Sequence, residues 1–282
     1  MGLLDGAILL AMAIIAGAIN AAVGSGSLLT LPVLLALGVP PGVAVRTNTV
    51  GMLFSTVGAC MGYRQEIRQE LPLLRPLILT TLCAACAGSM LLLVASPAAL
   101  DWVVPVLIVA ALLLVILQPT IAKRLTGAHS AAGTGTHSAA GTNSHSATGT
   151  GAHSLTEQAE RLRSPGLLAA MGGASVYGGF FTAAQGVLYL GVLGAFTGRD
   201  LRSVNSIKNL LSLVVNLAAT AVYLIAWAAL DAPILWLGAL IIGAGAMLGS
   251  YTGAHLARRF PEWLMRTVIV AVALFALVRQ FM

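Results

Sequence analysis

Near its start the chain reads Gly17-Ala-Ile-Asn-Ala-Ala-Val-Gly-Ser-Gly-Ser-Leu-Leu-Thr-Leu-Pro32, a Gly- and Ser-rich interruption in an apolar run long enough to cross a membrane. The hydrocarbon core holds no water, so backbone N–H and C=O groups that leave a helix there must be buried in protein or line a cavity. Paired breaks in two halves of a chain are the sequence feature that best indicates a transport site. The interruption therefore predicts a broken or re-entrant helix that uses its free backbone groups.

The composition is typical of a polytopic membrane protein. Of the 282 residues, 58% are hydrophobic and 9% are charged, whereas an average soluble domain has about 25% charged residues. Lys and Arg mostly end apolar segments and form no basic stripe with aromatics, which argues against nucleic acid and leaves the lipid bilayer as the expected partner. Residues 3–24 lack a basic leader and a cleavage site, so we expect a retained membrane helix there.

Apolar segments give the expected helices, since a span needs about 20 residues. Eight segments are long enough: 3–24, 43–62, 72–95, 102–119, 167–185, 204–229, 232–256 and 263–281. Two shorter segments, 27–38 and 187–197, each follow a Gly-rich break and are expected to complete a broken or re-entrant helix. The pattern predicts an all-α membrane protein with about eight transmembrane helices.

Residues 123–165 have a different character. Four histidines recur there every eight residues within Gly-, Ser-, Thr- and Ala-rich units, namely His129, His137, His145 and His153. Such a segment cannot bury a core, so we expect a disordered cytoplasmic linker between a first membrane repeat, 1–122, and a second, 166–282. A His tract could bind metal. Ordering each ligand on a floppy chain would cost much entropy, which favours a plain linker without metal or cofactor.

The two halves share one order of elements: a break, a short segment, a small-residue turn and a polar-headed helix. A shift of 160 residues brings segment 43–62 onto 203–222. Lys and Arg gather in the loop 63–71, at the linker ends and in the loop 257–262, which the positive-inside rule places in the cytoplasm. The loops around Asp101 and Asp231 carry no Lys or Arg, so we expect them on the outer side of the membrane. Equivalent elements then run in opposite directions, which predicts an inverted repeat of the kind found in transporters.

Polar clusters head the corresponding helices, Arg46-Thr-Asn-Thr49 in the first half and Asn205-Ser-Ile-Lys-Asn209 in the second. All nine Asp and Glu residues lie at or near segment ends, in loops or in the linker. What remains is positive charge, amides, hydroxyls and free backbone N–H groups, which together favour an anionic substrate. The purely structural alternatives are that Lys208 extends its ammonium group to the membrane surface and that the polar side chains hydrogen-bond neighbouring helices. The expected substrate-binding residues are Asn20, Gly24, Ser25, Gly26, Thr47, Asn48, Gln185, Gly186, Lys208 and Asn209.

Cys83 and Cys86 leave a second class of function open, because a CxxC pair can carry redox or sulfur-relay chemistry. Their small neighbours favour close helix packing instead. Metalloprotease, nucleophile-elbow and Walker motifs are absent from the sequence, so we expect no enzyme.

As an ordered set, these motifs resemble the sulfite exporter TauE/SafE family of bacterial membrane permeases. The resemblance is carried by residues 16–27, Pro32, 38–41, 44–48, 177–186, 206–210 and 216–218. It implies a multi-pass permease of the bacterial inner membrane, with eight membrane helices, for sulfite, organosulfonates or other small anions. Export by alternating access is the expected activity and ion-coupled uptake is the alternative. Gln185 stands where the family usually has more glycine, which predicts a less open second half-site.

Overall fold

The computed structural model describes residues 2–22, 24–132, 162–199, 201–256, 267, 270 and 271. Each regular element that it places in these ranges is an α-helix. The helices are α1 Leu3–Ala22, α2 Ser27–Ala36, α3 Pro41–Gly62, α4 Arg64–Glu70, α5 Arg75–Val94, α6 Pro97–Ala132, α8 Pro165–Phe181, α9 Gln185–Thr197, α10 Leu201–Leu230 and α11 Trp236–Leu256. The predicted segment 263–281 lies almost wholly outside the described residues.

Four of the described helices are long and apolar enough to span a bilayer, at Leu3–Ala21, Arg75–Val94, Pro97–Leu117 and Ser203–Leu230. Shorter apolar helices cover Ser27–Ala36, Gln185–Thr197 and Trp236–Thr252. α3 has 22 residues and carries the polar cluster around Asn48 near its start, and it is not one of these four candidate spans. Large apolar side chains such as Leu79 and Leu240 are exposed, as lipid contact requires. The chain is a multi-pass, all-α membrane protein.

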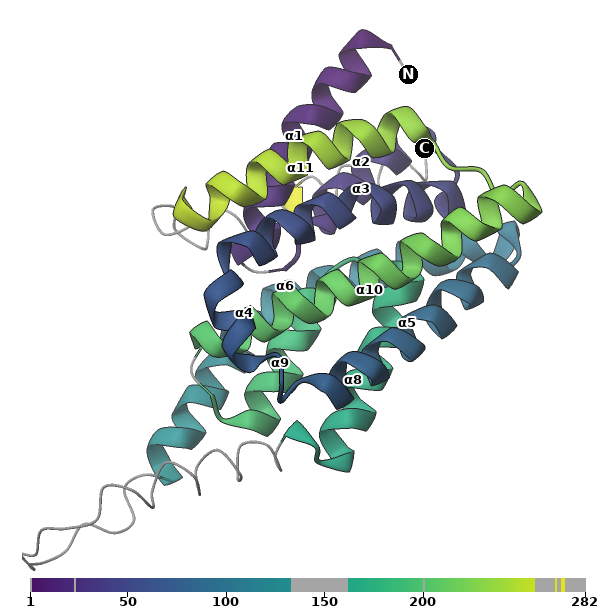
Figure 1. The fold of residues 1–282 in the computed structure, drawn as a ribbon. Coiled ribbons are helices and arrows are strands. Elements are labelled where there is room, and N and C mark those ends of the chain that lie inside the picture. The colour runs from purple at the N-terminus through teal and green to yellow at the C-terminus, as the bar shows by residue number, and fades with distance from the viewer. Residues whose placement is uncertain are drawn as a thin grey trace, which may run out of the picture.

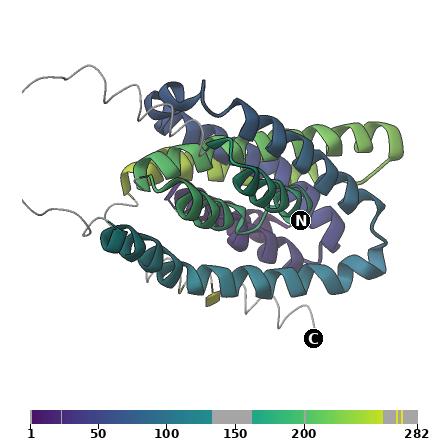
Figure 2. The same cartoon turned by 90° about the horizontal axis from the view of Figure 1, so that it is seen from below.

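The helices pack side by side in the order α1, α11, α3, α10, α5, α8, so neighbours in space are often far apart in sequence (Figure 1). The short helix α2 contacts α1, α3 and α6, and the short helix α9 contacts α8, α10 and α6. α6 runs along one side of this bundle as a single long helix (Figure 2). Each half therefore supplies helices that pack against the other half.

Glycine permits the closest of these approaches. A Cβ built on Gly17 of α1 would lie 2.1 Å from the carbonyl oxygen of Ala246 in α11. One built on Gly88 of α5 would lie 2.1 Å from the carbonyl oxygen of Val176 in α8. Membrane helices gain little from excluding lipid, so packing of this closeness between small residues contributes much of their association.

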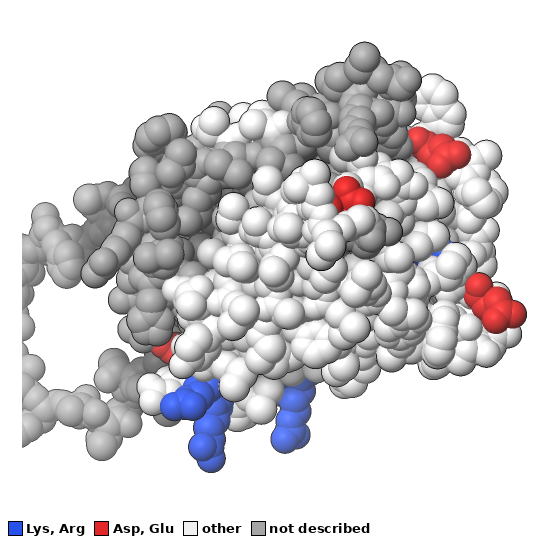
Figure 3. Space-filling model, turned by 90° about the horizontal axis from the view of Figure 1, so that it is seen from above, with Lys and Arg blue, Asp and Glu red and all other residues white. Residues whose placement is uncertain are grey.

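The turns gather at two opposite ends of the bundle. The α2–α3, α5–α6 and α10–α11 turns line one cavity, at the end that carries Asp101 and Asp231. α3 runs from this end to α4, where Glu70 forms an ion pair with Arg199 of the α9–α10 turn. The loop charges predict the same grouping of turns. In Figure 3 the face seen from above is largely uncharged, with Lys and Arg at one edge and Asp and Glu mainly toward the other.

α6 is longer than expected. It continues through residues 123–132, which the composition assigns to the linker, because a helix that is already formed gains about one hydrogen bond for each residue it adds. Residues 133–161, with three of the four histidines, lie outside the described part of the chain. The boundaries of the two repeats and the linker stay predictions.

Candidate substrate site

The two breaks touch each other. α1 ends at Ala22 and α2 begins at Ser27, while α8 ends at Phe181 and α9 begins at Gln185. The N–H of Gly186 donates a hydrogen bond to the carbonyl oxygen of Gly24 across 3.2 Å. A Cβ on Gly24 would lie 2.6 Å from the Cα of Gly186. This backbone contact leaves no room for a side chain on either residue.

Lys208 lies beside this contact. Its side chain comes from α10 and has no solvent exposure. Its Cδ would be 3.4 Å from a Cβ built on Gly24, so the alkyl chain passes the crossing of the breaks. Its Nζ has no hydrogen-bond partner among the described residues. The structure therefore shows a buried lysine and not one that snorkels to the surface.

Several predicted site residues share this condition. Buried side-chain atoms without a partner in the described part of the chain include Ser25 Oγ, Asn48 Nδ2, both amide atoms of Gln185 and Asn209 Nδ2. Buried polar groups without partners are rare, and each costs about 1–3 kcal/mol. Together with Lys208, five predicted residues thus keep hydrogen-bonding capacity that the described protein does not use.

Three other predicted residues are occupied in packing. The Nδ2 of Asn20 donates to Ser55 Oγ at 3.0 Å, and that hydroxyl lies 2.7 Å from the hydroxyl of Ser250. The hydroxyl of Thr47 accepts from the N–H of Leu235 at 3.0 Å, at the start of α11. A Cβ on Gly26 would lie 2.2 Å from the carbonyl oxygen of Ala16 in α1. These contacts hold helices together, and a substrate role for these three residues stays a prediction.

Two threonines that are not among the predicted site residues join the two halves of the chain here. The hydroxyls of Thr49 in α3 and Thr182 in the second break lie 2.9 Å apart. The hydroxyl of Thr30 donates to Asn48 Oδ1 at 2.5 Å, which leaves the Nδ2 of that amide as the free donor. Thr49 directly follows the predicted residue Asn48, and Thr182 lies three residues before the predicted residue Gln185, so both stand close in sequence to the predicted site.

The second break takes a left-handed backbone without glycine. Thr182 has φ +66° and Ala184 has φ +57°, a conformation that costs an ordinary residue about 1–2 kcal/mol. Tyrosines brace the segment: Tyr177 donates to the carbonyl of Ala183 at 2.8 Å, and Tyr223 donates to that of Gly179 at 2.8 Å. The strained turn is therefore held by bonds to its carbonyls.

Gln185 occupies space beside this turn. A Cβ on Gly178 would lie 2.6 Å from Gln185 Oε1, so the amide lies directly on the glycine backbone. The side chain fills volume that glycine in its place would leave empty.

Cys83 is exposed on α5 and Cys86 is half-buried on the same helix, and both are free thiols. The described residues contain no group of three or more His, Cys, Asp or Glu side chains that could hold a metal ion. Cys86 packs against a buried apolar cluster, as the packing interpretation expects, whereas Cys83 is exposed and does not.

An all-helical, multi-pass protein with two touching helix breaks and unpaired buried polar groups has the structure of a membrane transporter. The sequence pattern of the sulfite exporter TauE/SafE family matches residues 9–279. The chain belongs to that family, and this places it as a multi-pass protein of the bacterial inner membrane and a membrane transporter.

Two relatives agree with this assignment. The chain is 22% identical to the probable membrane transporter protein YfcA of Escherichia coli strain K12, over 94% of this chain and 86% of the relative. It is 30% identical to the probable membrane transporter protein ORF9 of a Sinorhizobium species, over 40% of this chain and 43% of the relative. No solved structure matches the chain.

Proposed function

We propose that the protein carries a small anion, of the sulfite or organosulfonate class, across the inner membrane by way of the crossing between Gly24 and Gly186. The observation that carries the proposal is the ammonium group of Lys208, which is fully buried and unpartnered in the described residues. The family and its named relatives support transport, and the choice of substrate rests on the chemistry of this group.

Charge balance favours an anion. An unpaired cation inside a membrane protein is costly and usually marks a functional site. By whole-residue exposure, the other buried charged residue of the described part is Arg46, which is also positive, and no Asp or Glu is buried there. A bound anion would supply the negative charge that Lys208 lacks.

The neighbouring donors suit an oxyanion. Asn48 and Asn209 each have a free Nδ2 group, Gln185 has a free Nε2 group, and Ser25 has a free hydroxyl. A sulfite or sulfonate group has three oxygens that can accept such bonds, and bonds to a charged group contribute about 1.5–3 kcal/mol each. Selectivity would come from placing amides and a hydroxyl around one ammonium group.

Two inverted repeats would give alternating access. If α1, α3 and α5 correspond to α8, α10 and α11, the packing order α1, α11, α3, α10, α5, α8 reads the same from both ends. A pseudo-two-fold axis between α3 and α10 is consistent with this order. Rocking of one repeat against the other around the crossing would then open the site to each side in turn.

Export follows from the membrane potential. An inside-negative potential favours exit of a monovalent anion by about 2.3 kcal/mol per 100 mV. Export therefore needs no coupling ion, which suits a described core without buried carboxylates. Uptake would need a coupling ion, so flux that requires a Na⁺ or H⁺ gradient would contradict export by potential alone.

The test is flux of radiolabelled sulfite in vesicles with a set potential, comparing wild type with Lys208→Met, which keeps the chain length and removes the charge. We expect at least a tenfold loss of initial rate, the effect of about 1.4 kcal/mol of lost stabilisation. Arg68→Met, at an exposed position of α4, is the matched loss of a positive charge and should transport normally. Wild-type flux in Lys208→Met would remove Lys208 from the site.

A further inference from the structure

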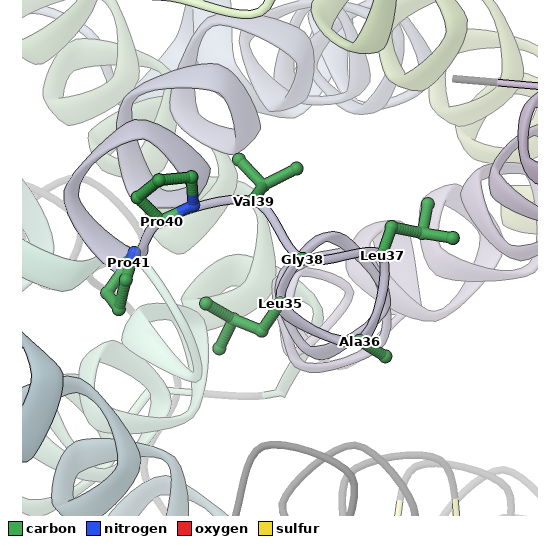
Figure 4. A pocket seen from close by; sticks show the side chains of 7 residues that line it. All are labelled: Leu35, Ala36, Leu37, Gly38, Val39, Pro40 and Pro41. Carbon is green, nitrogen blue, oxygen red and sulfur yellow. The ribbon is translucent and has the colours of Figure 1, made fainter.

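A cavity of about 430 Å³ opens at the end of the bundle where the α2–α3, α5–α6 and α10–α11 turns meet. Its lining includes Arg46, Asp101 and Asp231 among mostly apolar residues, and it does not include Lys208. An adjoining hollow is lined only by Leu35–Pro41, whose side chains in Figure 4 are all aliphatic. Of the two, the cavity that contains Arg46, Asp101 and Asp231 is therefore the one with charged groups that could bind a solute.

Arg46 is the buried charge of this cavity. The residue as a whole is 9% exposed. The Nε–H donates to the carbonyl oxygen of Pro233 at 3.1 Å, which fixes the plane of the guanidinium against the α10–α11 loop. A guanidinium has four further N–H donors on its two Nη atoms. None of these donates a hydrogen bond to another described residue, although Arg46 lines the cavity.

We propose that this cavity is a second, outer anion site, in which the Nη groups of Arg46 bind the oxyanion on its way between Lys208 and the outside. The proposal rests on the proposed function and extends it by one binding step. Arg46 stands two residues before Asn48 on α3, a rise of about 3 Å along the helix axis. At about 100° per residue the two side chains leave nearly opposite faces of α3, so Arg46 forms a site that is separate from Asn48 and nearer to the outer end. The planar fork of its guanidinium suits two oxygens of one anion.

The two carboxylates set the strength of this site. Asp101 and Asp231 are exposed, whereas Arg46 is buried. Water and salt screen the exposed carboxylates more than the buried cation, so the cavity attracts an anion at Arg46 and repels it weakly at the mouth. Conduction requires sites that bind well enough to be entered and weakly enough to be left. The carboxylates would lower the affinity and so speed release.

The test uses naphthalene-1,5-disulfonate, a rigid dianion, as a blocker of sulfite flux applied to one side of oriented vesicles. From the side of Asp101, Arg46→Gln should raise the half-blocking concentration about tenfold or more, because a charge-assisted pair is lost. Arg46→Lys should recover part of the block. Asp231→Asn should lower the half-blocking concentration about twofold. Block from the opposite side should be equal in all four proteins.

Arg46→Gln also disturbs the bond to Pro233, so a variant that leaves Arg46 intact is needed. Val43→Cys lies in the cavity lining, and in a background without native cysteines the disulfonate should slow its reaction with a thiol reagent. Block by the disulfonate that is unchanged in Arg46→Gln, together with no protection of Val43→Cys, would overturn the outer site.

The two proposals can fail separately. Binding of the disulfonate to purified protein can be followed by the fluorescence of the disulfonate itself. In Lys208→Met protein this binding should still be strong, and it should weaken when Arg46→Gln is added. If wild type moves no sulfite but this binding persists, the outer site stands as a binding site and the transport proposal fails. If sulfite flux persists and binding does not depend on Arg46, only the outer site fails.

Discussion

The backbone of Gly186 bonds to the backbone of Gly24, so the second helix break is fastened to the first without any side chain. Both residues lie at the point where the two halves of the chain meet, next to the alkyl chain of Lys208. Because main-chain atoms make this contact, neither glycine can be replaced by a larger residue without moving the two breaks apart. Substitution at either position is therefore a direct test of the site.

Gly24→Ala should abolish transport and destabilise the protein. The new Cβ would lie 2.6 Å from the Cα of Gly186, and Gly24 has φ +81°, which an L side chain rarely adopts. Strain of this kind costs about 1–3 kcal/mol. The measurements are thermal unfolding in detergent and sulfite flux in vesicles.

Gly173→Ala is the control for that change. Gly173 lies inside α8, and a Cβ there would meet nothing within 4 Å. Replacing it should be neutral or stabilise by about 0.5–1 kcal/mol, because alanine loses less freedom in a helix than glycine. Equal effects of the two substitutions would show that the contact with Gly186 is unimportant.

The hydroxyl pair of Thr49 and Thr182 should show a measurable coupling between the halves. In a double-mutant cycle with Thr49→Val and Thr182→Val, we expect an interaction free energy of about 0.6 kcal/mol, typical of polar pairs in membrane proteins. The two hydroxyl hydrogens serve three acceptors, namely the other hydroxyl and the carbonyl oxygens of Val45 and Gly178, so one hydrogen is shared between two of them. The cycle subtracts what each hydroxyl contributes without the other. Strict additivity in unfolding free energy would argue that the 2.9 Å contact is not formed.

Replacing Cys83 and Cys86 together with alanine should leave sulfite flux and thermal stability nearly unchanged. Cys83 is exposed on α5 and Cys86 is half-buried, so neither substitution opens a large cavity. A large loss of flux in this variant, with normal unfolding, would favour the redox or sulfur-relay alternative over simple transport.

Orientation is tested by thiol labelling in a protein without its three native cysteines. Asp101→Cys and Arg64→Cys place single thiols at exposed positions of opposite ends of the bundle. In intact cells, an impermeant maleimide should label Asp101→Cys at once and Arg64→Cys only after the membrane is permeabilised. Labelling of both from one side would contradict the topology drawn from the loop charges.

Much of the fold could be predicted because apolar runs and their interruptions define membrane helices directly. α1, α5 and α10 begin and end within three residues of the segments 3–24, 72–95 and 204–229 expected from the sequence. The burial of Lys208 was also predictable, since it stands a turn inside an apolar helix without an acidic neighbour on that helix.

The partners of Asn20 and Thr47 could not be predicted in the same way. Asn20 reaches Ser55, whose hydroxyl meets Ser250 at a separation of 195 residues. Thr47 meets Leu235 at a separation of 188 residues. No local pattern encodes such pairings, so both residues were expected in the substrate site although tertiary bonds occupy them.

The left-handed turn at Thr182 and Ala184 was hidden for another reason. The usual signal for φ > 0 is glycine or asparagine, and this turn has neither at those positions. Bonds from Tyr177 and Tyr223 to nearby carbonyls hold it instead. The break itself was predicted from the glycines around it, but its conformation was not.

The crosswise packing of α1 on α11 and of α8 on α5 has a consequence for how the protein is made. The ribosome delivers α1 and α5 to the bilayer before their main partners α11 and α8 exist. The faces of these early helices at Gly17 and Gly88 therefore stay exposed to lipid until their partner helices are synthesised. A chain that ends before α8 would leave both faces uncovered, and one that ends before α11 would leave the face at Gly17 uncovered.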